Sequence, residues 1–226
     1  ALSSAASDVY KRQELNGIMF LDRGCNCSLN NTIIYFMITS KKELKLYILQ
    51  DRIMNKYNRT GVKGKILDLI APNIIIKFLT MLRYAEYYSN IGSMRKYLYA
   101  IRLRSLSQRL GFYIPINTCG PGLSLPHYGT IIINKNACIG KNCRIHACVN
   151  IGASAGEQTC PRIGDNVYIG PSAVIFGDIR IANNVTIGAN ATVNRSCDEE
   201  YVVLAGSPAK VVKTESRNWI EFNKLK

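Results

Sequence analysis

The chain has 226 residues, and its hydrophobic fraction of 47% is ordinary for a globular protein and excludes wholesale disorder. It contains no apolar run of about 18 residues, so no membrane-spanning helix is predicted. Most of its formal net charge of +14 lies in residues 37–112, where 15 Lys or Arg face 4 Asp or Glu. Such a basic surface can attract nucleic acid, an anionic membrane surface or acidic metabolites, although a solvated helix face explains it more simply.

The first 36 residues show no clear hydrophobic periodicity. Their opening, ALSSAASDVYKRQ, looks more like a translated sequencing-adapter scar than a protein segment. Met37 stands just before the segment SKKE at residues 40–43, which has the Ser and Glu spacing of a helix capping box. We therefore expect residues 1–36 to be a non-native or disordered leader, with a genuine flexible arm as the alternative.

Residues 37–110 follow a helical period and are expected to form a helical N-terminal domain. The first helix opens at Ser40, a short segment covers 65–70, and a third helix covers 74–88. Lys77 and Arg83 interrupt the apolar stripe of this third helix, so we expect it to pack on a neighbour or to lie on a membrane surface.

A fourth helix is predicted over residues 93–110. Its apolar side chains Tyr97, Ile101, Leu106 and Leu110 are expected to face the core. Its Lys and Arg side chains are then directed outward, which gives the region its basic surface.

From Gly111 the helical period gives way to a period of six residues. Aliphatic residues recur with this spacing at Ile133, Ile139, Ile145, Ile151, Ile163, Ile169, Ile175, Ile181, Ile187 and Val193. A second apolar residue follows most of them at Ala137, Cys143, Val149, Val167, Ala173, Ile179, Val185, Ala191 and Cys197. Residues that tolerate the left-handed turn conformation lie between them, including Asn136, Asn142, Asn166, Asp178, Asn184 and Asn190.

Neither a helix, with a period of about 3.6 residues, nor an ordinary strand, with a period of 2, explains this spacing. Short strands joined by tight turns do explain it, and hexapeptide repeats are typical of a parallel β-helix in which each coil buries its apolar side against the next. The predicted fold class is therefore α+β. A helical N-terminal region (37–110) precedes a parallel β-helix (111–213) and a C-terminal tail (214–226).

The repeat breaks at residues 153–162, where ASAGEQTCPR replaces the pattern. Ile151 and Ile163 are 12 residues apart, so the register resumes as though one hexapeptide had become a loop. Interruptions of a solenoid commonly carry its binding surface.

The eight cysteines include no CxxC pair. Cys143 and Cys197 stand where the repeat needs a small apolar filler, which free cysteine supplies. The paired Cys or His spacing of structural zinc is absent, so we expect no metal. Without a secretory signal, these thiols indicate a reducing, cytoplasmic compartment.

The region from Gly111 to Lys213 resembles the serine acetyltransferase branch of the hexapeptide-repeat acyltransferases. The segments that carry the resemblance are GLSLPHYGTIIIN, ACIGKNCRIHACVNIGAS, PRIGDNVYIGPSAVIFGDIRIANNVTIGANATV and AGSPAKVV. The resemblance implies a left-handed coil, acetyl-CoA as co-substrate, and homotrimers or stacked trimers with active sites between neighbouring coils.

The resemblance also implies a histidine that acts as general base on the acceptor hydroxyl, and this role falls on His127 of the LPH segment. An imidazole can take the proton of an attacking alcohol and return it to the departing thiolate. A turn or core histidine satisfied by a backbone carbonyl is the structural alternative. His146 lies 19 residues later, nearly one coil away, and is the second catalytic candidate in the same cleft.

Contacts with CoA in this family are largely backbone groups along the coil edge, with basic residues near the phosphates. The matching positions are Gly152, Ala153, Gly170, Ala173, Ala189, Arg195 and Lys210. Arg195 and Lys210 are assigned to the phosphates, which favour Lys and Arg partners. Exposed surface charge is the alternative for both.

Several positions depart from the serine-specific pattern. Pro126 replaces an aspartate before the catalytic histidine, Thr159 and Cys160 replace an arginine and a histidine of the loop, and Tyr113 or a neighbour replaces an acidic residue upstream. An amino-acid acceptor needs a carboxylate for its ammonium group and a cation for its carboxylate. These losses favour an uncharged hydroxyl, such as a sugar of a surface-polysaccharide precursor, over L-serine. Cys160 as a nucleophile is the less favoured alternative.

The first functional hypothesis is an acetyl-CoA-dependent O-acetyltransferase of the serine acetyltransferase type, with a small-molecule hydroxyl acceptor and no nucleic-acid partner. The second is a non-catalytic β-helix scaffold whose basic helices dock on a membrane surface or a partner protein. Stabilisation by acetyl-CoA separates the two. A zinc enzyme on this fold would need three histidine ligands, and the chain has two histidines.

Overall fold

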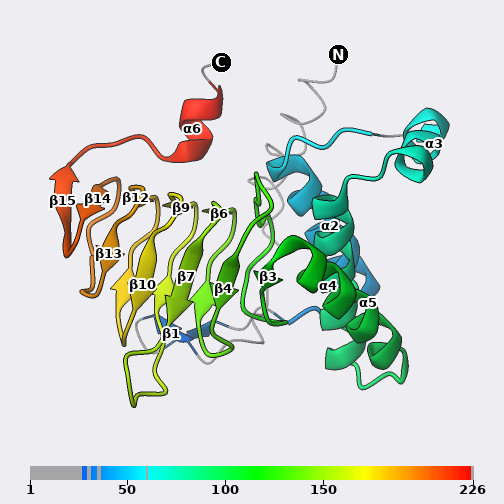
Figure 1. The fold of residues 1–226 in the computed structure, drawn as a ribbon, viewed down its shortest axis with the longest axis horizontal. Helices are drawn as coiled ribbons and strands as arrows, with labels where there is room; N and C mark the ends of the chain where they lie inside the picture. Colours follow the sequence, from blue (N-terminus) through cyan, green and yellow to red (C-terminus); the bar gives the residue numbers. More distant parts are fainter. Residues whose placement is uncertain (1–26, 30–31, 35–36, 60, 225–226) are drawn as a thin grey trace.

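The computed structural model describes residues 27–29, 32–34, 37–59 and 61–224, which form a group of helices beside a three-sided β-helix (Figure 1). The predicted leader at 1–36 lies mostly outside the described residues. Within it, β1 (Cys27–Leu29) and β2 (Thr32–Ile34) pair in antiparallel fashion, which the sequence pattern did not predict.

The helical region consists of α2 (Lys41–Met54), α3 (Gly61–Ile70), α4 (Ile74–Asn90) and α5 (Arg95–Leu110). The predicted capping box opens α2, because the Ser40 hydroxyl accepts from the N–H of Glu43 and the Glu43 carboxylate accepts from the N–H of Ser40. The Asn73 side chain caps α4, and Gly111 ends α5 with a left-handed φ of 76°. The four predicted helices are confirmed, although α3 begins earlier than its apolar pattern suggested.

Helix α4 is the centre of the helical region and packs against both α2 and α5. Several of its apolar residues, including the fully buried Phe78 and Leu82, join the core of the β-helix. The Phe78 ring packs edge-on against Phe112 of the first coil, with centroids 5.1 Å apart. The prediction that this helix packs on a neighbour is confirmed, and its burial removes the alternative that it lies on a membrane surface.

Helix α5 turns a different face inward from the one predicted. Leu106 and Leu110 are buried as expected, but Tyr97 is 56% exposed and Ile101 is 70% exposed. The prediction that these two side chains face the core is therefore wrong. The half-buried Tyr99 lies against α4 instead, and its ring stacks on Tyr84 and Tyr88 of that helix.

The β-helix is built from short strands on three faces. Sheet 1 contains β3 (Phe112–Tyr113), β4 (Ile131–Ile133), β7 (Val149–Gly152), β10 (Val174–Phe176) and β13 (Thr192–Val193). Sheet 2 contains β5 (Cys138–Ile139), β8 (Arg162–Ile163) and β11 (Arg180–Ile181). Sheet 3 contains β6 (Arg144–Ile145), β9 (Tyr168–Ile169), β12 (Thr186–Ile187), β14 (Val203–Gly206) and β15 (Ala209–Lys213), the last of which is antiparallel.

The pairing register confirms the period of six. Ile133 pairs with Ile151 and Ile175 pairs with Val193, one coil of three hexapeptides apart in each case. Ile151 pairs with Ile175, one hexapeptide further along, because the extra residues leave the coil as a loop between β7 and β8 (Figure 1). Every member of the two predicted apolar columns is buried.

Two of the three corners of each coil use the left-handed conformation. Asn142, Asn166 and Asn184 stack at one corner with φ values of 55°, 58° and 61°, and their side-chain amides bond to one another. Asn136 and Asp178, also expected to be left-handed, have no positive φ, and beside Asp178 it is Gly177 that adopts a positive φ, of 95°.

A buried charged cluster of Asp51, Arg83 and Glu86 joins the helices to the first coil. Arg83 forms ion pairs with Asp51 at 2.8 Å and Glu86 at 3.0 Å, and it donates to the carbonyls of Cys119 and Gly120. Burial raises the pKa of both carboxyl groups despite the arginine. Burial alone would lower the pKa of Arg83, but the two carboxylates raise it well above its usual range. The cluster therefore fixes the backbone that leads into the LPH segment.

After β15 the chain returns over the coils and ends in α6 (Trp219–Lys224) (Figure 1). The indole N–H of Trp219 donates to the carbonyl of Asn142 at 3.1 Å, and the Asn218 amide donates to Asn184 at 3.0 Å. The tail is thus attached to the asparagine corner. Across the described residues, none of the helices has the length and apolar character needed to cross a bilayer.

Candidate active site

The two histidines of the chain lie together where the helices meet the first coils. His127 is exposed in the turn that follows the bridge between Ser124 and Arg144, and His146 is half-buried after β6. Their ring centroids are 5.7 Å apart. The structure therefore brings together the two side chains that the sequence placed in one cleft.

A cavity of about 290 Å³ opens beside His127, between the end of α2, the start of α4 and the segment from Ser124 to His127. Lys56 and Arg144 also line it. None of the described residues that line this cavity is an Asp or a Glu. An acceptor molecule in this cavity would meet cations, amides and a hydroxyl, with the His127 imidazole at the edge.

The side chain of Arg144 lies between His146 and the C-terminal tail. Its Nε is 3.4 Å from Nε2 of His146, its Nη1 is 3.4 Å from the Ser124 hydroxyl, and its guanidinium carbon lies over the Trp219 ring, 5.3 Å from the ring centroid. On the other side of His146, the Tyr168 ring is 4.9 Å away. We call His127, Arg144, His146, Tyr168 and Trp219 the histidine cluster.

The environments of the two imidazoles differ. Burial, the charge of Arg144 and the neighbouring His127 together lower the pKa of His146 from 6.5 to about 4. His146 is therefore neutral near pH 7 and is a weak proton acceptor, because a general base works best with a pKa near the operating pH. His127 is exposed beside the cavity, which makes it the stronger candidate for the base.

A track of small residues leads away from His146 along sheet 3. Because Ile145, Ile169, Ile187 and Leu204 pair in successive coils, the residues after them stack as well. These are His146, Gly170, Gly188 and Ala205, and Ala205 pairs in turn with Lys210. With strands about 4.8 Å apart, the track from His146 to Lys210 extends roughly 19 Å. The track has no bulky side chain between His146 and Lys210, and it ends at an exposed cation.

The predicted cofactor residues fall at two corners of the coil. Gly170, Ala189 and Lys210 lie where sheet 3 leads into sheet 1, whereas Gly152, Ala153 and Arg195 lie at the end of sheet 1. A single chain therefore does not bring all of them together.

Ala173 does not present a free group to a cofactor. It is fully buried in the second interior column, its N–H donates to the Gly170 carbonyl and its carbonyl accepts from Asn150. The repeat position that Ala173 occupies points into the coil.

Two positions that depart from the serine-specific pattern, Cys160 and Tyr113, differ in burial. Cys160 is buried, and burial raises the pKa of its thiol, so it is a poor nucleophile. Tyr113 is 62% exposed on the outer face of sheet 1, away from the core.

The sequence interpretation missed three members of the histidine cluster. Arg144 could have been found, because it lies two residues before His146 along extended chain, where alternate side chains share a face. Tyr168 occupies the same coil position as Arg144 in the next coil. Trp219 carried no local signal, because its contact with Arg144 depends on the path of the tail.

Comparisons with known proteins show a similarity to hexapeptide-repeat transferases. Residues 160–195 match the family described as bacterial transferase hexapeptide (six repeats). The chain is 35% identical over 130 residues to a serine acetyltransferase of Staphylococcus epidermidis, an alignment that covers 54% of this chain and 59% of that protein. The chain thus spans less than two thirds of the length of the curated relatives it matches.

Solved structures agree with this likeness. A serine acetyltransferase of Neisseria gonorrhoeae aligns with a TM-score of 0.62 and 26% identity over 79% of this chain and 69% of that chain. A serine acetyltransferase of Brucella abortus aligns with a TM-score of 0.61 over 77% of this chain and 70% of that chain, and its 22% identity shows the shared fold alone. The predicted resemblance to the serine acetyltransferase branch of the hexapeptide-repeat acyltransferases is confirmed.

Proposed function

We propose that the chain is an acetyl-CoA-dependent O-acetyltransferase of the serine acetyltransferase type, which moves an acetyl group to a hydroxyl of a small acceptor. The observation that carries this proposal is the pair of histidines at one end of the small-residue track, on a fold shared with serine acetyltransferases. Left-handed winding of the coil belongs to the same proposal. So does a cytoplasmic location, which suits the free thiols at Cys119, Cys138, Cys143, Cys148, Cys160 and Cys197.

In this mechanism His127 acts as general base. Its imidazole takes the proton of the acceptor hydroxyl as the oxygen attacks the thioester carbonyl carbon, which forms a tetrahedral intermediate. The intermediate then expels the CoA thiolate, and the imidazolium of His127 returns the proton to the sulfur. The products are the acetyl ester and CoA, and no covalent acyl-enzyme is needed.

The small-residue track is the proposed path of the CoA arm. Gly170 and Ala189 would contact its length, and Lys210 would meet its phosphates at the far end. Gly152, Ala153 and Arg195 lie at the other corner of the coil, so they would contribute from a neighbouring subunit.

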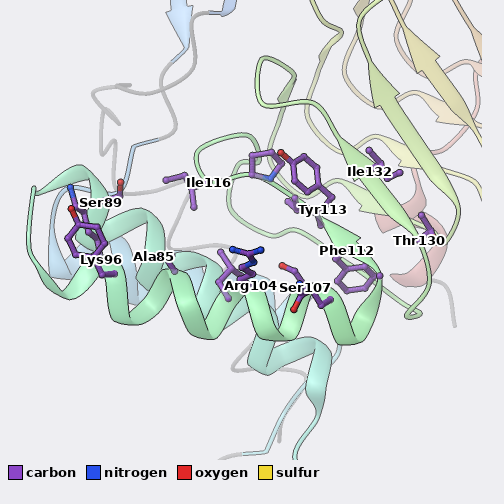
Figure 2. A pocket seen from close by; sticks show the side chains of 17 residues that line it. Ala85, Ser89, Lys96, Arg104, Ser107, Phe112, Tyr113, Ile116, Thr130 and Ile132 are labelled. Atoms are coloured by element: carbon purple, nitrogen blue, oxygen red, sulfur yellow. The ribbon is translucent and has the colours of Figure 1, made fainter.

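That arrangement requires an oligomer, and we propose a homotrimer or stacked trimers. Sheet 1 supports this, because Tyr113, Ile132 and Val174 expose apolar side chains on its outer face. A groove of about 960 Å³ continues this face toward α5, with Tyr113 and Ile132 on the strand side and Ser107 on the helix side (Figure 2). Sedimentation equilibrium tests the proposed homotrimer, and a monomer at the concentration used for activity assays would contradict it.

The proposed acceptor is a sugar hydroxyl, such as that of a surface-polysaccharide precursor, in preference to L-serine. The supporting observation is that no carboxylate among the described lining residues meets the position of an ammonium group. An acceptor screen should compare L-serine, free sugars and nucleotide-linked sugars by the release of CoA thiol from acetyl-CoA. Turnover with sugars supports the proposal; turnover with L-serine alone would reverse the preference.

A non-catalytic scaffold that docks on a membrane or a partner protein is the second candidate, and α5 is the feature that favours it. Met94, Leu98 and Ile101 are 76%, 49% and 70% exposed beside the basic residues of this helix, which contains no acidic residue. Thermal unfolding separates the candidates, because acetyl-CoA should raise the melting temperature of the enzyme and leave that of a scaffold unchanged.

A further inference from the structure

Arg144 is a half-buried cation whose partners among the described residues are all neutral. They are the Ser124 hydroxyl, the His146 ring nitrogen and the Trp219 ring. In the part of the chain that the structure describes, Arg144 forms no ion pair with a carboxylate. A charge removed from water without a counter-charge is costly, and burial accordingly lowers the pKa of Arg144.

Four arginines of the described residues, Arg59, Arg83, Arg162 and Arg180, have carboxylate partners. Arg83, the most buried, has both Asp51 and Glu86, and even the partly exposed Arg162 pairs with Asp178. Arg144 has no such partner, although it is half-buried.

The charge of Arg144 faces the cavity beside His127. Arg144 lines one part of it, Lys56 lines another, and the described lining residues include no acidic side chain. Nη2 of Arg144 makes no hydrogen bond to the described residues, so the planar guanidinium retains donor capacity for an oxyanion.

We propose that this cavity is an anion subsite for the acceptor, in which Arg144 and Lys56 bind a phosphate or carboxylate group while His127 takes the proton of the acceptor hydroxyl. The catalytic part of this inference rests on the proposed function, whereas anion binding by Arg144 does not. The substrate class that follows is a sugar that carries a phosphate or an acidic group.

Two aromatic residues hold Arg144 in position. The Trp219 ring lies against its guanidinium, and the indole N–H of Trp219 is itself anchored on the Asn142 carbonyl. His146 stays neutral near pH 7 and can accept from Nε of Arg144 instead of repelling it. Both are positioning residues, and the C-terminal tail forms part of the support of the subsite.

The subsite also selects against a zwitterion. L-Serine would bring an ammonium group near two cations, without a carboxylate of the described lining to offset it. The phosphates of CoA are a second source of the same anionic chemistry. We assign the subsite to the acceptor because it lies at the His127 end, whereas the small-residue track leads away from it toward Lys210.

The chain offers a direct test, because it contains two histidines and both lie in the cluster. Inorganic phosphate should be titrated into the full chain with isotope-labelled imidazole rings, followed by NMR. We expect saturable shifts of both imidazole signals. Bound phosphate should also raise the pKa of His146, because the anion offsets the charge of Arg144.

Variants make the titration specific. Arg144→Gln should weaken phosphate binding about tenfold or more, Arg144→Lys should restore part of it, and Arg162→Gln, on sheet 2, should leave it unchanged. Unmoved imidazole signals in the wild type, or equal phosphate affinity in Arg144→Gln, would overturn the proposal. Native chemical shifts of the other residues check that each variant is folded.

Steady-state kinetics decides whether the anionic group bound by Arg144 belongs to the acceptor or to CoA. With a phosphorylated sugar as acceptor, Arg144→Gln should raise the KM for the acceptor about tenfold and leave the KM for acetyl-CoA unchanged. A rise in the KM for acetyl-CoA alone would assign the anion to CoA and contradict the acceptor subsite. If no acceptor is acetylated, the proposed function fails, while the phosphate titration still decides whether the subsite exists.

Discussion

The β-helix and the helical region achieve stability in different ways. In the β-helix, buried aliphatics repeat in register from coil to coil, so each contact has several equivalents above and below it. The helical region meets the first coil through a buried cluster of Asp51, Arg83 and Glu86 that has no equivalent elsewhere among the described residues. Repetition makes the first region tolerant and readable from sequence, whereas the second depends on a few specific polar contacts.

The largest expected effect on stability comes from breaking the charged cluster. Arg83→Met should lower the free energy of unfolding by about 3–5 kcal/mol, because it leaves two buried carboxylates without their cation. Urea denaturation followed by circular dichroism should show the helices unfolding before the β-helix. Arg59→Ala removes a partly exposed ion pair with Asp68 and should cost less than about 1 kcal/mol. Equal losses in the two variants would contradict the role of the cluster.

The loss of one buried aliphatic side chain in the β-helix should act differently from the loss of the charged cluster. Ile169→Ala creates a cavity between Ile145 and Ile187 in a fully buried column and should cost about 3 kcal/mol. Because neighbouring coils keep their contacts, the loss should leave one cooperative transition in urea. The control Val212→Ala, at a 62% exposed position of β15, should change the free energy of unfolding by well under about 1 kcal/mol.

A smaller effect tests the close stacking of the coils. A methyl group at Gly170 would lie 2.7 Å from the backbone nitrogen of Ala189, so Gly170→Ala should cost about 2 kcal/mol. At Gly152 the nearest atom would be Asn150 Oδ1 at 3.7 Å, so Gly152→Ala should be tolerated. Thermal unfolding of the two variants distinguishes them, and a neutral Gly170→Ala would show that the coils can separate.

The smallest effect concerns pH. An unfolded imidazole takes up a proton near pH 6.5, whereas native His146 does so at about pH 4, so the unfolded state binds more protons between these values. The free energy of unfolding should therefore fall as the pH drops through this window, by about 1 kcal/mol, because the half-exposed ring is screened by solvent. His146→Gln should flatten this part of the stability curve measured in urea, and an unchanged slope would contradict the lowered pKa.

The comparison between the two regions also explains what the sequence could predict. The period of six identified the coils, both buried columns and the loop, because a solenoid repeats the same local environment. The capping box at Ser40 was equally local. The inward face of α5 was misassigned at Tyr97 and Ile101, because the neighbour of a helix is decided by tertiary packing that periodicity alone does not contain.

The residues of the candidate site also fall into those that local sequence patterns predict and those that depend on tertiary packing. His127 and His146 could be placed in one cleft from their spacing of nearly one coil. Arg83 was read as an interruption of an apolar stripe, although it is fully buried, because its partners lie on another helix and in the first coil. Trp219 reaches Arg144 only through the return of the tail, which no local pattern encodes.

The central claim is that the imidazole of His127 removes a proton from the acceptor hydroxyl during acetyl transfer. The most direct test compares the steady-state turnover of the wild type and His127→Ala with acetyl-CoA and the acceptor found in the screen. Turnover should fall by about 100- to 10,000-fold, with the melting temperature unchanged because the side chain is exposed. Turnover of the variant equal to that of the wild type would contradict the account.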